Sequence, residues 1–87
     1  MPTIEQLRKQ IEQIDARIIE KLAQRQELSK QIGQLKREKG LAVVDPAQEK
    51  KLFELYESLC AQYQLSPTLV KRLFKSIMIH SRNLQKF

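Results

Sequence analysis

The chain has 87 residues, enough for one compact domain but with a thin core if the chain stays monomeric. It has only 2 glycines and 3 prolines, and Leu, Ile, Gln, Lys and Glu dominate, which favours helices over sheets. The net charge of +6 indicates an anionic ligand. The basic residues, however, mix with glutamates and do not interleave with aromatics, so we expect no nucleic-acid partner.

The sequence carries no pattern typical of export, membrane insertion or metal binding. No apolar run is long enough to span a bilayer, and the first residues do not resemble a signal peptide, so we expect a cytoplasmic protein without membrane contact. Cys60 lies in an apolar stripe and is expected to be a buried thiol, whereas His80 is expected at a surface or interface. No Cys/His set has metal-ligand spacing, so neither metal nor cofactor is expected.

A long first helix is predicted between Thr3, a suitable N-cap, and Gly40, a suitable stop. Its apolar residues fall on one a/d heptad frame: Ile4, Leu7, Ile11, Ile14, Ile18, Leu28, Ile32 and Leu35. A helix of about 35 residues is roughly 50 Å long, too long for so small a globule to cover by itself. The exposed seam therefore predicts a partner helix, most simply the same helix of a second chain.

A second helix is predicted to start at Asp45, because Asp as N-cap, Pro46 at N1 and Gln48 at N3 form a helix-start signature. Its apolar face comprises Leu52, Phe53, Tyr56, Leu59, Cys60 and Tyr63.

A third helix is predicted to follow Ser66 and Pro67, which repeat the N-cap and N1 pattern. The residues expected to point inward are Leu69, Val70, Leu73, Phe74, Ile77 and Met78. The fold class is therefore all-α, with one long N-terminal helix and two shorter ones in an intertwined helical homodimer. We expect residues 1–87 to form a single domain.

Polar residues interrupt the apolar stripes at several positions. Lys21 and Arg25 occupy d and a positions of the first helix, and a buried cation without a partner costs several kcal/mol. Glu49 lies on the inward stripe of the second helix, and Ser81 and Gln85 extend that of the third. Each has an ordinary explanation, such as an interhelical ion pair, a helix-dipole acid or a solvated chain end. Together they are typical of a small polar-ligand pocket in a helix bundle.

Helix geometry separates the basic residues of the first helix into two groups. Arg25 and Lys36 are eleven residues apart, so they point nearly the same way, roughly 16 Å apart along the axis. Arg8 lies seventeen residues before Arg25, roughly 25 Å away and turned by about 100°. If Arg8 binds the ligand, it must therefore reach the site of the other protomer.

The pattern of these residues closely resembles the small all-helical, type II class of chorismate mutases. The resemblance covers nearly the whole chain and rests on Leu7, Arg8, Ile14, Asp15, Arg25, Lys36, Asp45, Glu49, Ser81 and Gln85. It implies the conversion of chorismate to prephenate, in phenylalanine and tyrosine biosynthesis, by a homodimer with two equivalent sites. A Claisen rearrangement is unimolecular and needs no nucleophile, metal or cofactor, which fits this inventory.

The resemblance also implies substrate-binding roles for these residues. Arg25, with Arg8 of the partner subunit, is similar to the clamp on the two substrate carboxylates, and Ser81 to a hydrogen-bonding residue of the same region. Lys36 and Gln85 resemble the donors aimed at the ether oxygen.

The implied partner of the ring hydroxyl is Glu49, assisted by Asp45. The catalytic set is therefore Lys36, Gln85, Arg25 and Glu49. One position departs from the family, because many members have Arg where this chain has Gln48. The change removes a positive charge near the site, which predicts weaker turnover or a substrate related to chorismate.

Three alternatives stay open at this point. Isochorismate-pyruvate lyases share the cations but usually lack the acidic pair, so Asp45, Glu49 and Ser81 favour the mutase. A 4-amino-4-deoxychorismate mutase is harder to separate, because Glu49 could bind an amino group. A non-enzymatic basic coiled-coil dimerisation module would explain the heptads, but not the polar interruptions.

Overall fold

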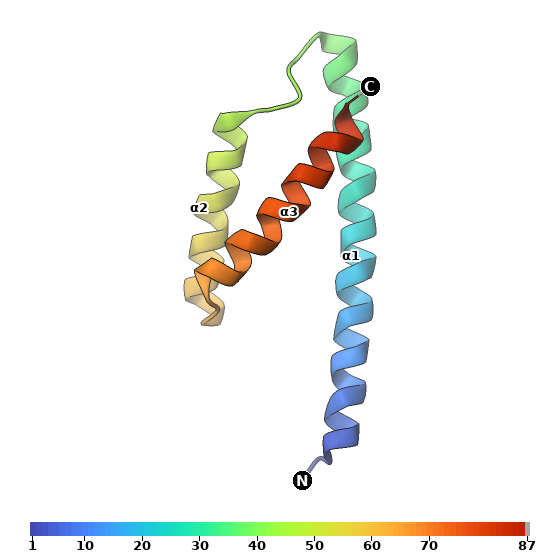
Figure 1. Ribbon diagram of the computed structural model, residues 1–87, viewed down its shortest axis with the longest axis vertical. Coiled ribbons are helices and arrows are strands. Elements are labelled where there is room, and N and C mark those ends of the chain that lie inside the picture. The colour runs from blue at the N-terminus through green and yellow to red at the C-terminus, as the bar shows by residue number, and fades with distance from the viewer. Residues whose placement is uncertain (87) are drawn as a thin grey trace.

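The computed structural model describes residues 1–86, and the chain there forms three α-helices and no strand (Figure 1). The helices are α1 (Ile4–Lys39), α2 (Pro46–Tyr63) and α3 (Pro67–Gln85). The predicted all-α class, with one long helix and two shorter ones, is confirmed. Phe87, the last residue of the expected single domain, lies outside the described residues.

Each helix begins at the N-cap that the sequence predicts. The Thr3 hydroxyl accepts a hydrogen bond from the backbone N–H of Gln6 at 3.1 Å, and the Gln6 side chain accepts one from the Thr3 N–H at 2.9 Å. Asp45 and Ser66 accept backbone bonds in the same way at the starts of α2 and α3. These bonds satisfy amide groups that a helix leaves unpaired in its first turn.

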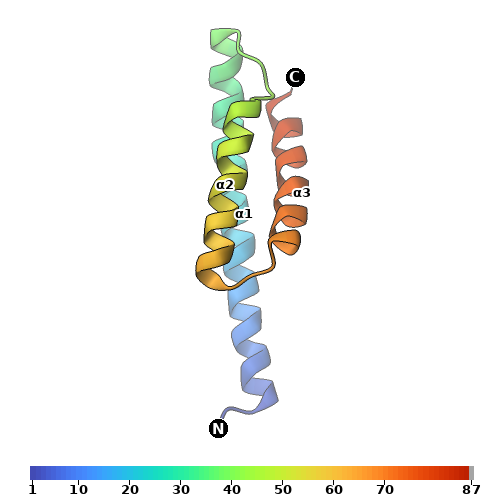
Figure 2. The same ribbon diagram turned by 90° about the vertical axis from the view of Figure 1, so that its left-hand side faces the viewer.

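The helix α3 lies between the other two and joins them. It packs against both α1 and α2, whereas α1 and α2 make no helix-to-helix contact in the described chain (Figures 1 and 2). The whole chain measures 57 × 24 × 15 Å, so one dimension is set by the length of α1 alone.

The hydrophobic core is small. The buried hydrophobic residues are Tyr56, Cys60 and Met78, so the predicted burial of Cys60 is confirmed. The Tyr56 ring stacks on Phe74 with ring centroids 4.1 Å apart, and this contact joins α2 to α3. His80 is exposed, as expected.

Two residues predicted to point inward, Leu69 and Leu73, are exposed in the single chain. Leu59 and Tyr63, from the predicted apolar face of the second helix, are exposed as well. No other helix within residues 1–86 covers these four side chains, so their burial in a homodimer stays a prediction.

The heptad seam of α1 is also uncovered. Its N-terminal end extends beyond α2 and α3 (Figure 1), and Ile11, Ile14 and Ile18 are 56%, 58% and 50% exposed. Exposed apolar surface of this extent marks an interaction site in a protein that stays folded in water. None of the helices is long and apolar enough to cross a membrane, taking residues 1–86.

A glycine allows a close approach between α1 and α3. A Cβ added at Gly33 would lie 2.8 Å from Cα of Gln85, which is backbone and cannot move aside without shifting α3. Gly33 is buried, and its missing side chain brings the end of α3 directly against α1.

We predict that Gly33→Ala destabilises the fold. Alanine gains up to about 1 kcal/mol in helix propensity, but overpacking against backbone costs about 1–3 kcal/mol. The net expectation is a lower melting temperature in a circular-dichroism melt. Gln34→Ala, at the exposed neighbouring position, should not lower it. A Gly33→Ala chain at least as stable as the parent would contradict the close helix contact.

Candidate functional site

A cavity of about 350 Å³ is lined by residues of all three helices and of the loop between α1 and α2. Its lining consists of Arg25, Ser29, Ile32, Lys36, Val43, Asp45, Gln48, Glu49, Leu52, Met78, Ser81, Arg82 and Gln85. It thus combines apolar walls with a few polar groups from separate elements, the usual construction of a small-ligand site.

The cavity brings together every site residue predicted from the sequence except Arg8. Arg25 and Lys36 point into the same space, as their spacing predicts. Arg8 lies on the exposed N-terminal half of α1 and does not line the cavity. Lys21 does not line it either, and its ammonium donates to the side-chain oxygen of Gln24 at 3.4 Å.

The carboxylate-binding candidates Arg25 and Ser81 contact each other. Nη1 of Arg25 donates a hydrogen bond to the Ser81 hydroxyl. Ser81 is buried and Arg25 is half-buried, so this bond holds the guanidinium against α3 while its other donors remain available. It is also one of the side-chain bonds that join α1 to α3.

Lys36 connects three segments of the chain. Its ammonium donates to the Val43 carbonyl at 2.7 Å and to the side-chain oxygen of Gln85 at 3.1 Å. A lysine ammonium has three donor hydrogens, so one remains for a ligand. Because the Gln85 oxygen accepts from Lys36, the amide NH₂ group of Gln85 is also left to donate. The site therefore offers two adjacent donors.

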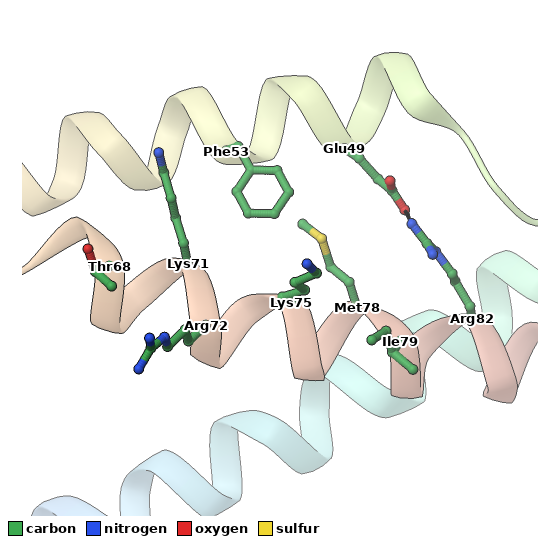
Figure 3. A pocket seen from close by; sticks show the side chains of 9 residues that line it. All are labelled: Glu49, Phe53, Thr68, Lys71, Arg72, Lys75, Met78, Ile79 and Arg82. Carbon is green, nitrogen blue, oxygen red and sulfur yellow. Dashed lines mark hydrogen bonds and ion pairs between the residues drawn. The ribbon is translucent and has the colours of Figure 1, made fainter.

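Glu49 has a partner that the sequence reasoning missed. Nε of Arg82 donates to Oε1 of Glu49 at 2.9 Å, and Nη2 donates to the same oxygen. Figure 3 shows the two side chains pointing toward each other from α2 and α3. Arg82 directly follows Ser81, which places it near the site. Helical spacing alone, however, does not choose it over other cations of α3 as the partner of Glu49.

Asp45 and Gln48 lie at the exposed rim of the cavity. The Asp45 carboxylate accepts a hydrogen bond from the Gln48 backbone N–H at 3.1 Å, so it caps α2 as predicted. No reciprocal bond from the Gln48 side chain to Asp45 is found, so the structure forms only half of the capping box that Gln48 suggested.

A further polar residue of the cavity is Ser29, which is buried. It lies four residues after Arg25, and this spacing was the available signal for it.

The charges of the cavity suit an anionic ligand. Glu49 and Arg82 neutralise each other as an ion pair, which leaves Arg25 and Lys36 as cations against the single carboxylate of Asp45 at the rim. The two negative charges of a bound dianion would lie close to Arg25 and Lys36, which both belong to α1.

A second cavity, of about 580 Å³, lies between α2 and α3 (Figure 3). It shares Glu49, Met78 and Arg82 with the first, so these three side chains separate the two spaces. Its other charged residues are Lys71, Arg72 and Lys75, and Lys71 is paired with Glu57 at 2.7 Å. Of the predicted site residues only Glu49 reaches it, so the first cavity is the candidate active site.

Comparison with known proteins identifies the family. A family model for chorismate mutase type II matches residues 7–86. The chain is also 28% identical over 81 residues to a chorismate mutase of Methanocaldococcus jannaschii, a match that covers 93% of this chain and 82% of the relative. The chain therefore belongs to the type II chorismate mutase family. The predicted function, chorismate mutase, is confirmed, and the protein is an isomerase.

We predict that Lys36→Met sharply reduces turnover of chorismate. The substitution removes the ammonium that faces the cavity, and loss of one such electrostatic donor typically costs on the order of 10²–10³ in rate. Initial rates of chorismate consumption measure the effect, with circular dichroism to verify folding. Lys30→Met, at an exposed position of the same helix that does not line the cavity, is the matched control and should retain activity. A folded Lys36→Met enzyme with parental rates would remove Lys36 from the site.

Proposed function

We propose that the enzyme acts as an intertwined homodimer with two equivalent chorismate sites. Each site consists of the cavity of one chain and Arg8 of the partner subunit. One observation carries the proposal. The cavity gathers all the predicted binding residues except Arg8, and Arg8 lies beside an apolar seam that its own chain leaves exposed. The second chain would complete the site and cover the seam by the same contact.

The heptad frame suggests how the two α1 helices pair. In an antiparallel pair related by a two-fold axis near Ile18, each residue faces the one equally far on the other side of that axis. Arg8 would then face Leu28, within about one helical turn of Arg25. This register brings Arg8 of each chain to the cavity of the other chain, as the shared site requires.

Two arginines and a serine would bind the substrate carboxylates. Arg25 is pre-positioned by its hydrogen bond to Ser81, so little side-chain entropy is lost when it meets an anion. Arg8 of the partner subunit would supply the second guanidinium. Fixing both carboxylates holds the flexible enolpyruvyl side chain over the ring, which is the compact conformer that the rearrangement needs.

The ether oxygen of chorismate would lie against Lys36 and Gln85. This oxygen gains negative charge as its bond to the ring breaks, and the remaining Lys36 hydrogen and the Gln85 amide would both donate to it. Because these two groups already contact each other, they need no rearrangement when the charge develops.

The ring hydroxyl would donate to Glu49. Both Arg82 donors go to Oε1 of Glu49, so Oε2 is left to accept from the substrate. Asp45 caps α2 at the rim and would act mainly by holding the first turn that carries Glu49. No proton transfer to or from the protein is required at any step. The product, prephenate, would serve phenylalanine and tyrosine biosynthesis, and residues 1–87 would form one domain.

Mixing two inactive variants tests the shared site. Arg8→Ala and Arg25→Ala should each lose nearly all turnover as separate homodimers. After subunit exchange, one site of each heterodimer has lost both arginines and the other retains both. With random exchange, about a quarter of the parental activity should return. The measurement is the initial rate of chorismate consumption before and after exchange.

The matched control mixes Arg25→Ala with Lys36→Ala. Both residues belong to the cavity of one chain, so each heterodimer site lacks one of them and no activity should return. Confirmed exchange without recovery in the Arg8 and Arg25 mixture would contradict the shared site.

A further inference from the structure

Arg82 has no role in the carboxylate clamp or at the ether oxygen, yet it lines the active-site cavity. Its side chain is 35% exposed and that of Glu49 is 26% exposed. An ion pair shielded to this extent is weakened less by water and salt than a fully exposed surface pair. Arg82 therefore alters the charge that Glu49 presents to a ligand.

The two carboxylate oxygens of Glu49 have different surroundings. Nε and Nη2 of Arg82 both donate to Oε1, and Oε2 receives no hydrogen bond from residues 1–86. A lone carboxylate at this place would attract an ammonium group more strongly than a hydroxyl, because the charge–charge term adds to the hydrogen bond. With Arg82 bound, the carboxylate stays an acceptor, but its charge is matched by an adjacent cation.

We propose that Arg82 is a specificity-determining residue that acts through Glu49. It makes Glu49 an acceptor for a neutral ring hydroxyl and disfavours a substrate with an ammonium group at that position, as in 4-amino-4-deoxychorismate. This inference rests on the proposed placement of the ring hydroxyl against Glu49. The chain would discriminate between two nearly isosteric substrates by a charge that need not touch either of them.

In a purely structural role, Arg82 would only hold α3 against α2 through its ion pair with Glu49. The described chain contains a second ion pair between these helices, Lys71 with Glu57, at 2.7 Å. Its side chains are 46% and 57% exposed, and neither residue lines the active-site cavity. Removing that pair weakens the same helix contact without changing the charge at Glu49, so Lys71 provides a matched control.

The test measures kcat/KM for chorismate and for 4-amino-4-deoxychorismate. The ratio compared between variants is kcat/KM for the amino substrate divided by kcat/KM for chorismate. The parent should favour chorismate. Arg82→Gln should raise the ratio about tenfold or more, because an unscreened charge term of this kind is worth at least one power of ten at a half-buried site. Arg82→Lys keeps the charge and should keep the ratio near that of the parent. Lys71→Gln should not change it.

An unchanged ratio in a folded Arg82→Gln dimer that still converts chorismate would overturn the inference. That result would leave the proposed function intact, since chorismate turnover and its loss in Arg25→Ala test that function separately. If Arg82→Gln does not fold, Arg82→Met replaces it, because methionine keeps an apolar stem for packing and removes the charge. The same rise is expected, and its absence contradicts the proposal. A parent that prefers the amino substrate would also contradict it.

Discussion

The contact between α1 and α3 is the constraint on which the site depends. The two helices approach each other closely at Gly33, where the absence of a side chain lets α1 contact the backbone of Gln85. On either side of this point, Arg25 bonds to Ser81 and Lys36 bonds to Gln85. The same contact therefore sets the helix spacing and orients the cationic groups. Since no helix contact joins α2 to α1, Glu49 of α2 is positioned through α3, by its pair with Arg82, and through the loop that Lys36 bonds at Val43.

The shape of the chain supports the proposed homodimer. A chain with so small a hydrophobic core gains little stability from burial. Its long helix leaves an apolar seam in water, and covering that seam supplies the burial that the single chain lacks. Catalysis has a matching requirement, because the proposed clamp binds the two substrate carboxylates with a guanidinium from each chain, and Arg8 does not line the cavity of its own chain. In the proposed dimer, one helix pairing satisfies both requirements.

Much of this could be predicted from the sequence. Helix bounds followed from caps such as Thr3 and Asp45, because capping is a local interaction. The shared direction of Arg25 and Lys36 followed from helical spacing, whereas the place of Gln85 beside Lys36 followed only from the family resemblance. The pairing of Arg82 with Glu49 could not be predicted, since it depends on how α2 and α3 are rotated about their axes. Periodicity shows which face of a helix points inward, but not the exact rotation of the helix. The hydrogen bond from Lys36 to the Val43 carbonyl could not be predicted either, because it depends on the path of a loop. Leu69 and Leu73 are exposed in the single chain, because an apolar stripe does not show which chain covers it.

The most direct test of the shared site is a crystal structure of the enzyme with a dicarboxylate transition-state analogue bound. We expect a two-fold dimer with antiparallel α1 helices. A guanidinium nitrogen from Arg8 of the partner subunit should lie within about 3 Å of a ligand carboxylate, as a charge-assisted hydrogen bond requires. Arg25 of the first chain should bind the ligand from the other side. A ligand held entirely by one chain, with Arg8 in solvent, would contradict the account.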